Sequence, residues 1–257
     1  MLRSTFCHVP GIGTTTEKTL WSQGCTTWDI YLSDPASWSV GSADRQLVLD
    51  MLQWSTEALE KRDHRFFSEA LGLRDSWRAW PEFQDRMLYL DIETDGGNLG
   101  ASITMVGLYD GDDFTCLVKG VDLERFPEHM ETCGMIVTFF GAGFDVPMLK
   151  KAFPAVPFNQ IHLDLCPAFK NLGIKGGLKK IEKQLGIWRG DDTDGLTGMD
   201  AIRLWRMHQL GNEEALRVLI AYNKEDVVNM KALAQIAYDR LKRAALGEAG
   251  LSSLDTP

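Results

Sequence analysis

The sequence predicts an α/β fold, with a mixed five-stranded sheet flanked by helices and a small helical region before it. Two observations carry this prediction. Apolar segments of strand length form a hairpin pattern and then alternate with helical segments, which is typical of a sheet covered by helices. Before them, residues 1–83 show helical patterns alone. We therefore expect a helical N-terminal region at 1–83, an α/β domain at 84–245 and a frayed tail at 246–257.

The N-terminal region divides into two helical parts. Residues 1 to about 40 are expected to form short helices separated by glycines. Residues 42–82 carry apolar side chains at helical spacing, from Leu47 to Leu71. Pro81 is expected to end this second part, because proline interrupts a helix.

The α/β domain contains five segments with the apolar content and length of strands. They are Arg86–Glu93, Ile103–Tyr109, Phe114–Lys119, Met135–Phe140 and Gln160–Leu165. A Gly-Asp-Asp turn at 111–113 joins the second segment to the third, which predicts a hairpin. Helices are expected between and after the strands, at Leu123–Cys133, Val146–Ala152, Leu178–Leu185, Met199–Leu210 and Glu213 to about Ala245.

Composition narrows the class of protein. Hydrophobic residues make up 44% of the chain, enough to fill a core, and the formal charge is −9. The negative charge argues against tight, non-specific binding to duplex nucleic acid, because such proteins carry a basic face. Five scattered cysteines without a CxxC pair indicate a reducing compartment. No segment approaches the roughly 20 apolar residues of a membrane span. We therefore expect a cytoplasmic protein without a membrane partner.

The first predicted strand ends in two carboxylates. Asp91 and Glu93 are spaced i, i+2, and alternation along a strand sends such residues to the same face. Two like charges side by side repel, and burying them without compensation is costly. A divalent cation with oxygen ligands would relieve that cost. The pair therefore predicts a metal site.

Two later segments can add acids to this site. Asp145 follows an apolar strand and a glycine-rich turn, where it could instead serve only as a helix N-cap. Tyr222 and Asp226 are spaced i, i+4 on the last helix and share one face, an arrangement that packing alone can also explain. Glu225 lies roughly a hundred degrees round that helix from Asp226, and we interpret it as a solvated charge.

Together these motifs resemble the DEDD exonuclease superfamily, a ribonuclease-H-like group that includes the proofreading domains of family B DNA polymerases. Their order is Asp-x-Glu at 91–93, Phe-Asp at 144–145 and Tyr-x-x-x-Asp at 222–226. The tyrosine marks the tyrosine subtype, since the histidine subtype needs histidine one residue earlier, where this chain has alanine. The chain is more narrowly similar to the YprB-like exonucleases over roughly 84–240. The stretches that carry this similarity are 144–149, 162–165, 176–179 and 222–227.

The resemblance implies a 3′→5′ exonuclease that uses two Mg²⁺ ions, with Mn²⁺ as a substitute. Two cations about 3.5–4 Å apart activate one water and steady the leaving oxygen of a phosphodiester. By the resemblance, Asp91, Glu93 and Asp226 would bind the ion that activates water. Asp91 would also help to hold the second ion, with Asp145 acting largely through coordinated water. Tyr222 would orient the nucleophile, since a phenol with a pKa near 10 is a poor base at neutral pH.

The chain departs from the family pattern at one position. An asparagine usually precedes the Phe-Asp motif in the family, and Phe140 is its nearest counterpart here. That asparagine is not a metal ligand in the family, so the resemblance leaves the ligand set intact. Asp164 matches a recurrent acidic position of the family. It is either a contact near the site or a structural cap, and we leave it outside the metal set.

Two segments are candidates for contact with nucleic acid. Lys175, Lys179 and Lys180 lie where a glycine-rich loop opens a helix, whose free N–H groups favour phosphate; the alternative is a solvated lysine face. Gly11 and Gly13 belong to a Gly-Ile-Gly turn that resembles half of a helix-hairpin-helix element, in which backbone amides approach a phosphate. The alternative for this turn is a scaffold packed on the catalytic domain.

The sequence therefore predicts a metal-dependent nuclease, and the resemblance implies action on single-stranded ends, DNA before RNA. DNA repair or end-trimming as its setting follows from the family resemblance alone. An exoribonuclease or a structure-selective endonuclease on the same fold is the alternative among nucleases. Two other classes remain open: a catalytically inactive nucleic-acid-binding module, and a metal-dependent phosphatase or small-nucleotide hydrolase. No GxxxxGK[ST] loop is present, so we expect no nucleotide cofactor. The oligomeric state is left open.

Overall fold

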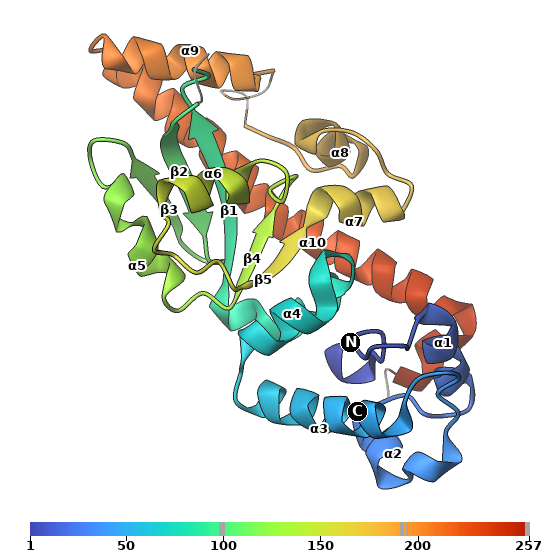
Figure 1. Ribbon diagram of the computed structural model, residues 1–257. Helices are drawn as coiled ribbons and strands as arrows, with labels where there is room; N and C mark the ends of the chain where they lie inside the picture. Colours follow the sequence, from blue (N-terminus) through green and yellow to red (C-terminus); the bar gives the residue numbers. More distant parts are fainter. Residues whose placement is uncertain (98–100, 191–192, 194, 255–257) are drawn as a thin grey trace.

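A mixed five-stranded sheet with helices on both faces lies above a helical N-terminal region (Figure 1). The structure is a computed structural model that describes residues 1–97, 101–190, 193 and 195–254, with side chains described up to residue 247. The α/β fold predicted from the sequence is confirmed, including the number of strands.

The strands occupy the predicted positions. They are β1 (Met87–Thr94), β2 (Ile103–Tyr109), β3 (Phe114–Val118), β4 (Met135–Thr138) and β5 (Ile161–Asp164). Their order in the sheet is β3-β2-β1-β4-β5, with β1, β2 and β3 antiparallel and with β4 and β5 parallel to β1. The hairpin predicted between β2 and β3 is therefore present, and β2 has the predicted bounds.

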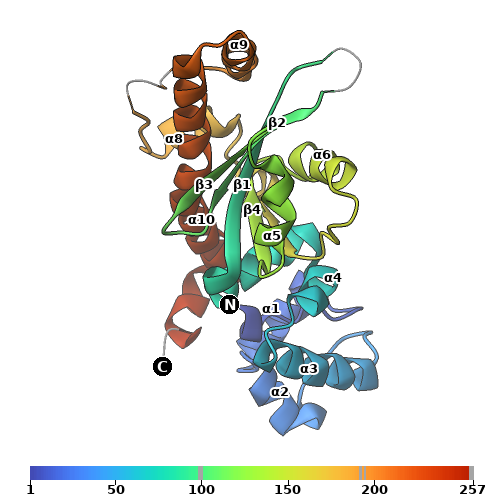
Figure 2. The ribbon, with the colours of Figure 1, turned by 90° about the vertical axis from the view of Figure 1, so that its left-hand side faces the viewer.

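The two faces of the sheet are covered by different helices (Figure 2). Leu90 and Ile92 of β1 belong to a buried cluster with residues of α5 (Phe126–Met130) and α6 (Asp145–Ala152). Tyr89 belongs to a second buried cluster, with residues of the long helix α10 (Glu213–Leu254). Side chains alternate along a strand, so Asp91 and Glu93 lie on the face of Tyr89 and point to the α10 side.

The remaining helices follow β5 in the chain. They are α7 (Leu165–Asn171), α8 (Leu178–Gln184) and α9 (Gly198–Gln209). The helix α7 was not predicted. It starts directly after β5, because Asp164 accepts a hydrogen bond from the backbone N–H of Cys166 and caps it. The helix expected at Leu123–Cys133 is shorter, a 3-10 turn at Leu123–Arg125 followed by α5.

The end of α10 overlaps the segment predicted to fray. The helix continues to Leu254, with non-helical geometry at Gly247. Residues 255–257 and the side chains of 248–254 lie outside the described part of the chain, so the frayed tail stays a prediction. None of the described helices has both the length and the apolar character that crossing a membrane requires.

Short helices make up the N-terminal region, as predicted. They are α1 (Thr14–Ser22), α2 (Trp28–Ser33), α3 (Arg45–Glu60) and α4 (His64–Asp75), with 3-10 turns at Leu2–Ser4, Pro35–Ser37, Ser76–Ala79 and Pro81–Arg86. The prediction that Pro81 ends the helical part is wrong. Pro81 opens a further 3-10 turn, because proline is compatible with the first position of a helix, where no N–H is needed.

The N-terminal region packs firmly on the α/β domain. One continuous buried cluster joins Leu2, Phe6 and Trp28 to Val227 and Met230 of α10. A buried ion pair within the N-terminal region lies beside the α/β domain, where Nη2 of Arg78 is 2.9 Å from Oε1 of Glu17 and both side chains are almost fully enclosed. The N-terminal region is therefore an integral support for the end of the molecule opposite α9 (Figure 1).

Candidate active site

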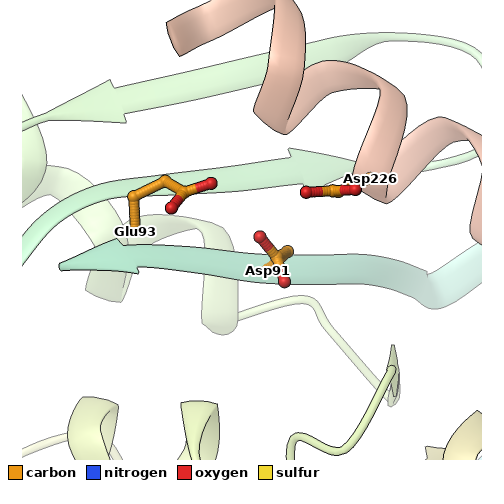
Figure 3. Close-up of side chains that lie close together, drawn as sticks. All are labelled: Asp91, Glu93 and Asp226. Carbon is orange, nitrogen blue, oxygen red and sulfur yellow. The ribbon is translucent and has the colours of Figure 1, made fainter. Parts of the chain in front are cut away.

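Three carboxylates from two elements converge on the α10 side of the sheet (Figure 3). Asp91 and Glu93 come from β1 and Asp226 from α10, and one oxygen of each lies within 4.8 Å of the other two. Glu93 and Asp226 are buried and Asp91 is half-buried. The spacing on β1 places the first two on one face, and the i, i+4 position of Asp226 relative to Tyr222 turns the third toward them.

Asp145 lies next to this cluster without belonging to it. It is the first residue of α6, and its Oδ1 accepts a hydrogen bond of 3.1 Å from the backbone N–H of Ile92. That N–H is available because β4 pairs with β1 only as far as Tyr89. The carboxylate thus bonds to the strand between Asp91 and Glu93, and it forms no capping hydrogen bond on its own helix. The simple N-cap interpretation of Asp145 is wrong.

The four acids share a strong excess of negative charge. Burial raises the pKa of Asp91 well above its ordinary value, and the neighbouring charges of Asp145, Asp226 and Glu93 raise it further. Burial and then Asp226 raise the pKa of Glu93 to about 8. Burial raises the pKa of Asp145 to about 7 against the opposing effect of the Ile92 N–H. Burial also raises the pKa of Asp226, although Arg189 pulls it down.

This charge excess is what a cation-binding site requires. Hard divalent ions prefer carboxylate oxygens, and here such oxygens are already assembled on rigid elements with too little positive charge around them. The donor set therefore fits a hard divalent cation, which Asp91, Glu93 and Asp226 would hold.

Asn223 also belongs to the site, although its sequence position did not predict a role there. Its Nδ2 donates a 3.0 Å hydrogen bond to Oδ2 of Asp91, and the side chain is fully buried. Its Oδ1 has no hydrogen-bond partner among the described residues. A Cβ on Gly107 of β2 would come within 1.8 Å of that oxygen, so the glycine leaves room for the amide. A glycine inside an apolar strand is a sequence signal of such a close approach.

Tyr222 lines an open cleft of about 390 Å³ together with Asp91 and Asp226. Burial and the neighbouring charge of Asp226 raise the pKa of its phenol, so the tyrosine stays protonated at neutral pH. Nζ of Lys179 lies 4.1 Å from the centre of the Tyr222 ring and donates to the backbone carbonyl of Leu196. Lys179 is therefore already engaged with protein groups, whereas Lys180 lines the same cleft with an exposed side chain.

The other candidates for nucleic-acid contact lie outside the cleft. Lys175 is exposed on the loop before α8. Gly11 has a positive φ and packs against Ala43, and Gly13 precedes the first turn of α1. Thr14, the next residue, lines the same cavity as Leu241 of α10, which lies about four helical turns or roughly 22 Å beyond Asp226. Where the first helix of a helix-hairpin-helix element would lie, the chain forms only the 3-10 turn Leu2–Ser4.

Asp164 acts as a clamp on the loop that carries Phe140. Its carboxylate accepts hydrogen bonds from the backbone N–H groups of Phe140 at 2.8 Å and Ala142 at 3.0 Å, in addition to capping α7. Phe140 has a φ of 66° and a side chain that is 57% exposed. Both interpretations considered for Asp164 are thus realised in one residue, which fixes the loop before Asp145.

Glu225 is not the solvated charge that we predicted. It accepts a hydrogen bond of 2.7 Å from the backbone N–H of Gly190 and another from the hydroxyl of Thr193. The partners lie more than thirty residues away in the sequence, so helical spacing alone gave no sign of them. Glu225 attaches the segment after α8 to α10, beside Asp226.

Comparison with known proteins identifies the family. Residues 88–238 match the model of the RNase H superfamily, and the chain belongs to that superfamily. This confirms the ribonuclease-H-like fold predicted from the sequence and supports a nuclease. Comparison with curated protein sequences gives no match.

Two solved structures are similar to this chain to different degrees. A family B DNA polymerase from the hyperthermophilic archaeon Pyrobaculum calidifontis is similar at 17% identity with a TM-score of 0.50, covering 65% of this chain. The match covers 26% of the polymerase, so this chain corresponds to about a quarter of that protein. The Nibbler EXO domain of Aedes aegypti aligns at 13% identity over 71% of this chain and 92% of that domain, with a TM-score of 0.38.

Proposed function

We propose that this member of the RNase H superfamily is a divalent-metal-dependent 3′→5′ exonuclease of the tyrosine subtype, acting on single-stranded nucleic-acid ends, DNA before RNA. The observation that carries the proposal is the convergence of Asp91, Glu93 and Asp226, with Tyr222 beside them in the same cleft. The similarity in fold to a family B DNA polymerase is consistent with this proposal.

Each residue of the site has a distinct task in this proposal. Asp91, Glu93 and Asp226 would hold the ion that activates water, and Asp91 with Asp145 would hold a second ion, largely through coordinated water on Asp145. Bound ions lower the pKa of a water and stabilise the charge on the leaving oxygen. The protonated Tyr222 hydroxyl would orient the attacking water by donating or accepting a hydrogen bond, and Asn223 keeps Asp91 in place.

The site also limits the substrate. A cleft of about 390 Å³ accepts a terminal nucleotide, whereas the chain as a whole carries a charge of −9 and so lacks the positive excess that binding to long duplexes favours. Lys180 and Lys175 would contact the phosphates that lead to the cleft. The amides at Gly11 and Gly13 would contact the strand further away.

The proposal is tested by degradation of 5′-labelled single-stranded DNA and RNA of equal sequence with Mg²⁺ or Mn²⁺. We expect a ladder of products that shorten by one nucleotide, and the faster polymer identifies the substrate. The matched control is the double variant Asp91→Ala, Glu93→Ala, which should lose the ladder while keeping its fold. An exoribonuclease would degrade only the RNA.

Two results would contradict the proposal. Internal cuts of a closed circular single strand would indicate an endonuclease on the same fold. Absence of cleavage with either ion, together with retained binding of the strands, would indicate a catalytically inactive binding module. In that case restoring asparagine by Phe140→Asn is the first variant to examine, because Phe140 departs from the family pattern.

A further inference from the structure

A buried arginine contacts one of the three clustered carboxylates. Nη2 of Arg189 donates a hydrogen bond to Oδ1 of Asp226, and the side chains are 6% and 8% exposed. Arg189 lies just after α8, and 37 residues separate it from Asp226 in the sequence. The sequence suggests only that it adds positive charge near the lysines of α8, not that it contacts a carboxylate of the cluster. Its position beside the cluster demands an explanation, because burying a guanidinium is costly unless its partners are well placed.

The guanidinium is held from a second side by Glu182 of α8. Nε of Arg189 lies 2.7 Å from Oε2 of Glu182, and Nη2 lies 2.9 Å from Oε1. Glu182 is itself buried and accepts a 3.0 Å hydrogen bond from Nδ2 of Asn229 on α10. The planar fork of arginine suits such a divided contact, since several N–H groups point in fixed directions.

The backbone around Arg189 is fixed as well. The next residue, Gly190, donates its N–H to Glu225, the neighbour of Asp226 on α10. A Cβ on Gly190 would lie 2.9 Å from Oε1 of that glutamate, so a glycine permits the contact. Arg189 is thus attached to α10 through two adjacent acids, one bound by its side chain and one by its neighbour's backbone.

The consequence falls on the orientation of Asp226. Its Oδ1 is occupied by Arg189, and the side chain reaches from α10 toward Asp91 and Glu93 (Figure 3). A carboxylate with one fixed oxygen cannot rotate freely, so its other oxygen keeps a constant direction. Groups that hydrogen-bond to metal-binding carboxylates orient them and tune their affinity for the metal.

We infer that Arg189 is a positioning residue, which fixes Asp226 so that its free oxygen faces Asp91 and Glu93 as a metal ligand. The inference rests on the proposed metal-dependent function and adds a residue that lies outside the acidic motifs. Glu182 and Asn229 support Arg189. We call this set of contacts the Arg189 clamp: it runs from Asp226 on α10 through Arg189 to Glu182 on α8, and back to Asn229 on α10.

Binding of Mn²⁺ by the purified full-length protein tests the clamp, measured by isothermal titration calorimetry without nucleic acid. The variants are Arg189→Met, which removes the guanidinium, and Arg189→Lys, which keeps the charge but cannot hold Glu182 and Asp226 together. Arg203→Met is the control for charge, because Arg203 is exposed and pairs with Asp200 on α9. We expect both Arg189 variants to bind Mn²⁺ about 10–100-fold more weakly than the wild type, and the control to bind it equally well.

Thermal melting of the metal-free variants separates positioning from support of the fold. A merely structural arginine would lower the melting temperature and leave the Mn²⁺ affinity of the folded protein unchanged, which overturns the inference. Tighter binding in the Arg189 variants also overturns it, because the guanidinium would then compete with the metal for Asp226. If Arg189→Met does not fold, Arg189→Lys decides by the same criteria.

Failure of the proposed function gives a different result. If the wild-type protein binds no Mn²⁺, both the proposed metal site and the proposed role of Arg189 are contradicted. If the wild-type protein and its Arg189 variants bind Mn²⁺ equally tightly, only the proposed role of Arg189 is contradicted.

Discussion

Two buried arginines, Arg78 and Arg189, each bridge two acidic side chains, but the acids around them differ in how well they are compensated. Arg78 joins Glu17 and Asp75 within the N-terminal region, beside the α/β domain. Arg189 joins Glu182 and Asp226 beside the carboxylate cluster. Both guanidinium groups are enclosed, so burial alone does not distinguish them.

The difference lies in how the acids around each arginine are satisfied. Oε2 of Glu17 accepts hydrogen bonds from the hydroxyl of Thr5 and from the backbone N–H groups of Phe6 and Cys7, while its Oε1 faces Arg78. The buried acid in the N-terminal region thus has donors of its own. At the cluster, Arg189 stands against several acids that repel one another, and their pKa values are raised. Removing one partner of the satisfied pair at Arg78 should therefore be costly for the fold, whereas the excess of acids at the cluster favours a cation.

The largest effect on stability is expected at the satisfied pair. Glu17→Gln leaves the buried Arg78 with one carboxylate and places an amide N–H against either the guanidinium or the backbone N–H of Phe6. Breaking a buried ion pair from one side costs about 3–5 kcal/mol. Urea unfolding followed by tryptophan fluorescence should show this loss, while the nuclease activity per folded molecule stays unchanged.

The matched control for that variant is Glu128→Gln, which breaks the exposed pair of Glu128 with Arg125. Exposed ion pairs contribute little, so the control should unfold at the wild-type urea concentration. If Glu17→Gln and the control behave alike, the N-terminal region does not depend on its buried ion pair and the contrast between the two regions fails.

The carboxylate cluster should make the stability of the protein depend on pH. The pKa of Glu93 is raised from 4.5 to about 8 and that of Asp145 from 3.8 to about 7, so the folded state keeps protons that the unfolded state has released. Their contribution to stability is complete below the unfolded values and is lost as pH rises through about 7–8. We expect the melting temperature of the protein in EDTA to fall between pH 6.5 and pH 8.

Two controls make this assignment specific. Burial lowers the pKa of His8 and of His162 from 6.5 to about 4, so these groups make the protein more stable as pH rises and cannot cause the fall. Glu93→Gln should flatten the decline and raise the melting temperature at pH 8. Saturating Mg²⁺ should do the same in the wild type, because the ion replaces the protons. A decline that survives both changes belongs to other groups.

Within the site, the sequence predicts the acids but not the groups that bind them. The strands and the acids Asp91, Glu93 and Asp226 follow local patterns, namely alternation along a strand and i, i+4 spacing on a helix. The hydrogen-bond partners that surround the acids do not. Asn223 reaches Asp91 across 132 residues and Arg189 reaches Asp226 across 37, so only the folded chain brings them together.

The smaller misses have local physical causes. The helix α7 has seven residues and begins where β5 ends, which leaves too short a segment for a helical period to stand out. The 3-10 turn at Pro81 uses the one helical position that tolerates proline. Gly107 is the instructive case, because an isolated glycine within the apolar strand β2 is a local sequence signal, and it marks the space that Asn223 occupies.

The smallest expected effect concerns the two neighbouring lysines of α8. It distinguishes a lysine that contacts the substrate from one that contacts only groups of the protein. Lys180 is exposed at the cleft, whereas Nζ of Lys179 is engaged by Leu196 and the ring of Tyr222. Each phosphate contact with a single strand contributes about 0.7 to the slope of log affinity against log salt. In an Asp91→Ala background, Lys180→Gln should reduce that slope by about 0.7 for a labelled single strand in fluorescence anisotropy, and Lys179→Gln should leave it unchanged. Equal reductions in the two variants would show that Lys179 also binds phosphate, and that its contact with Tyr222 gives way when the strand enters the cleft.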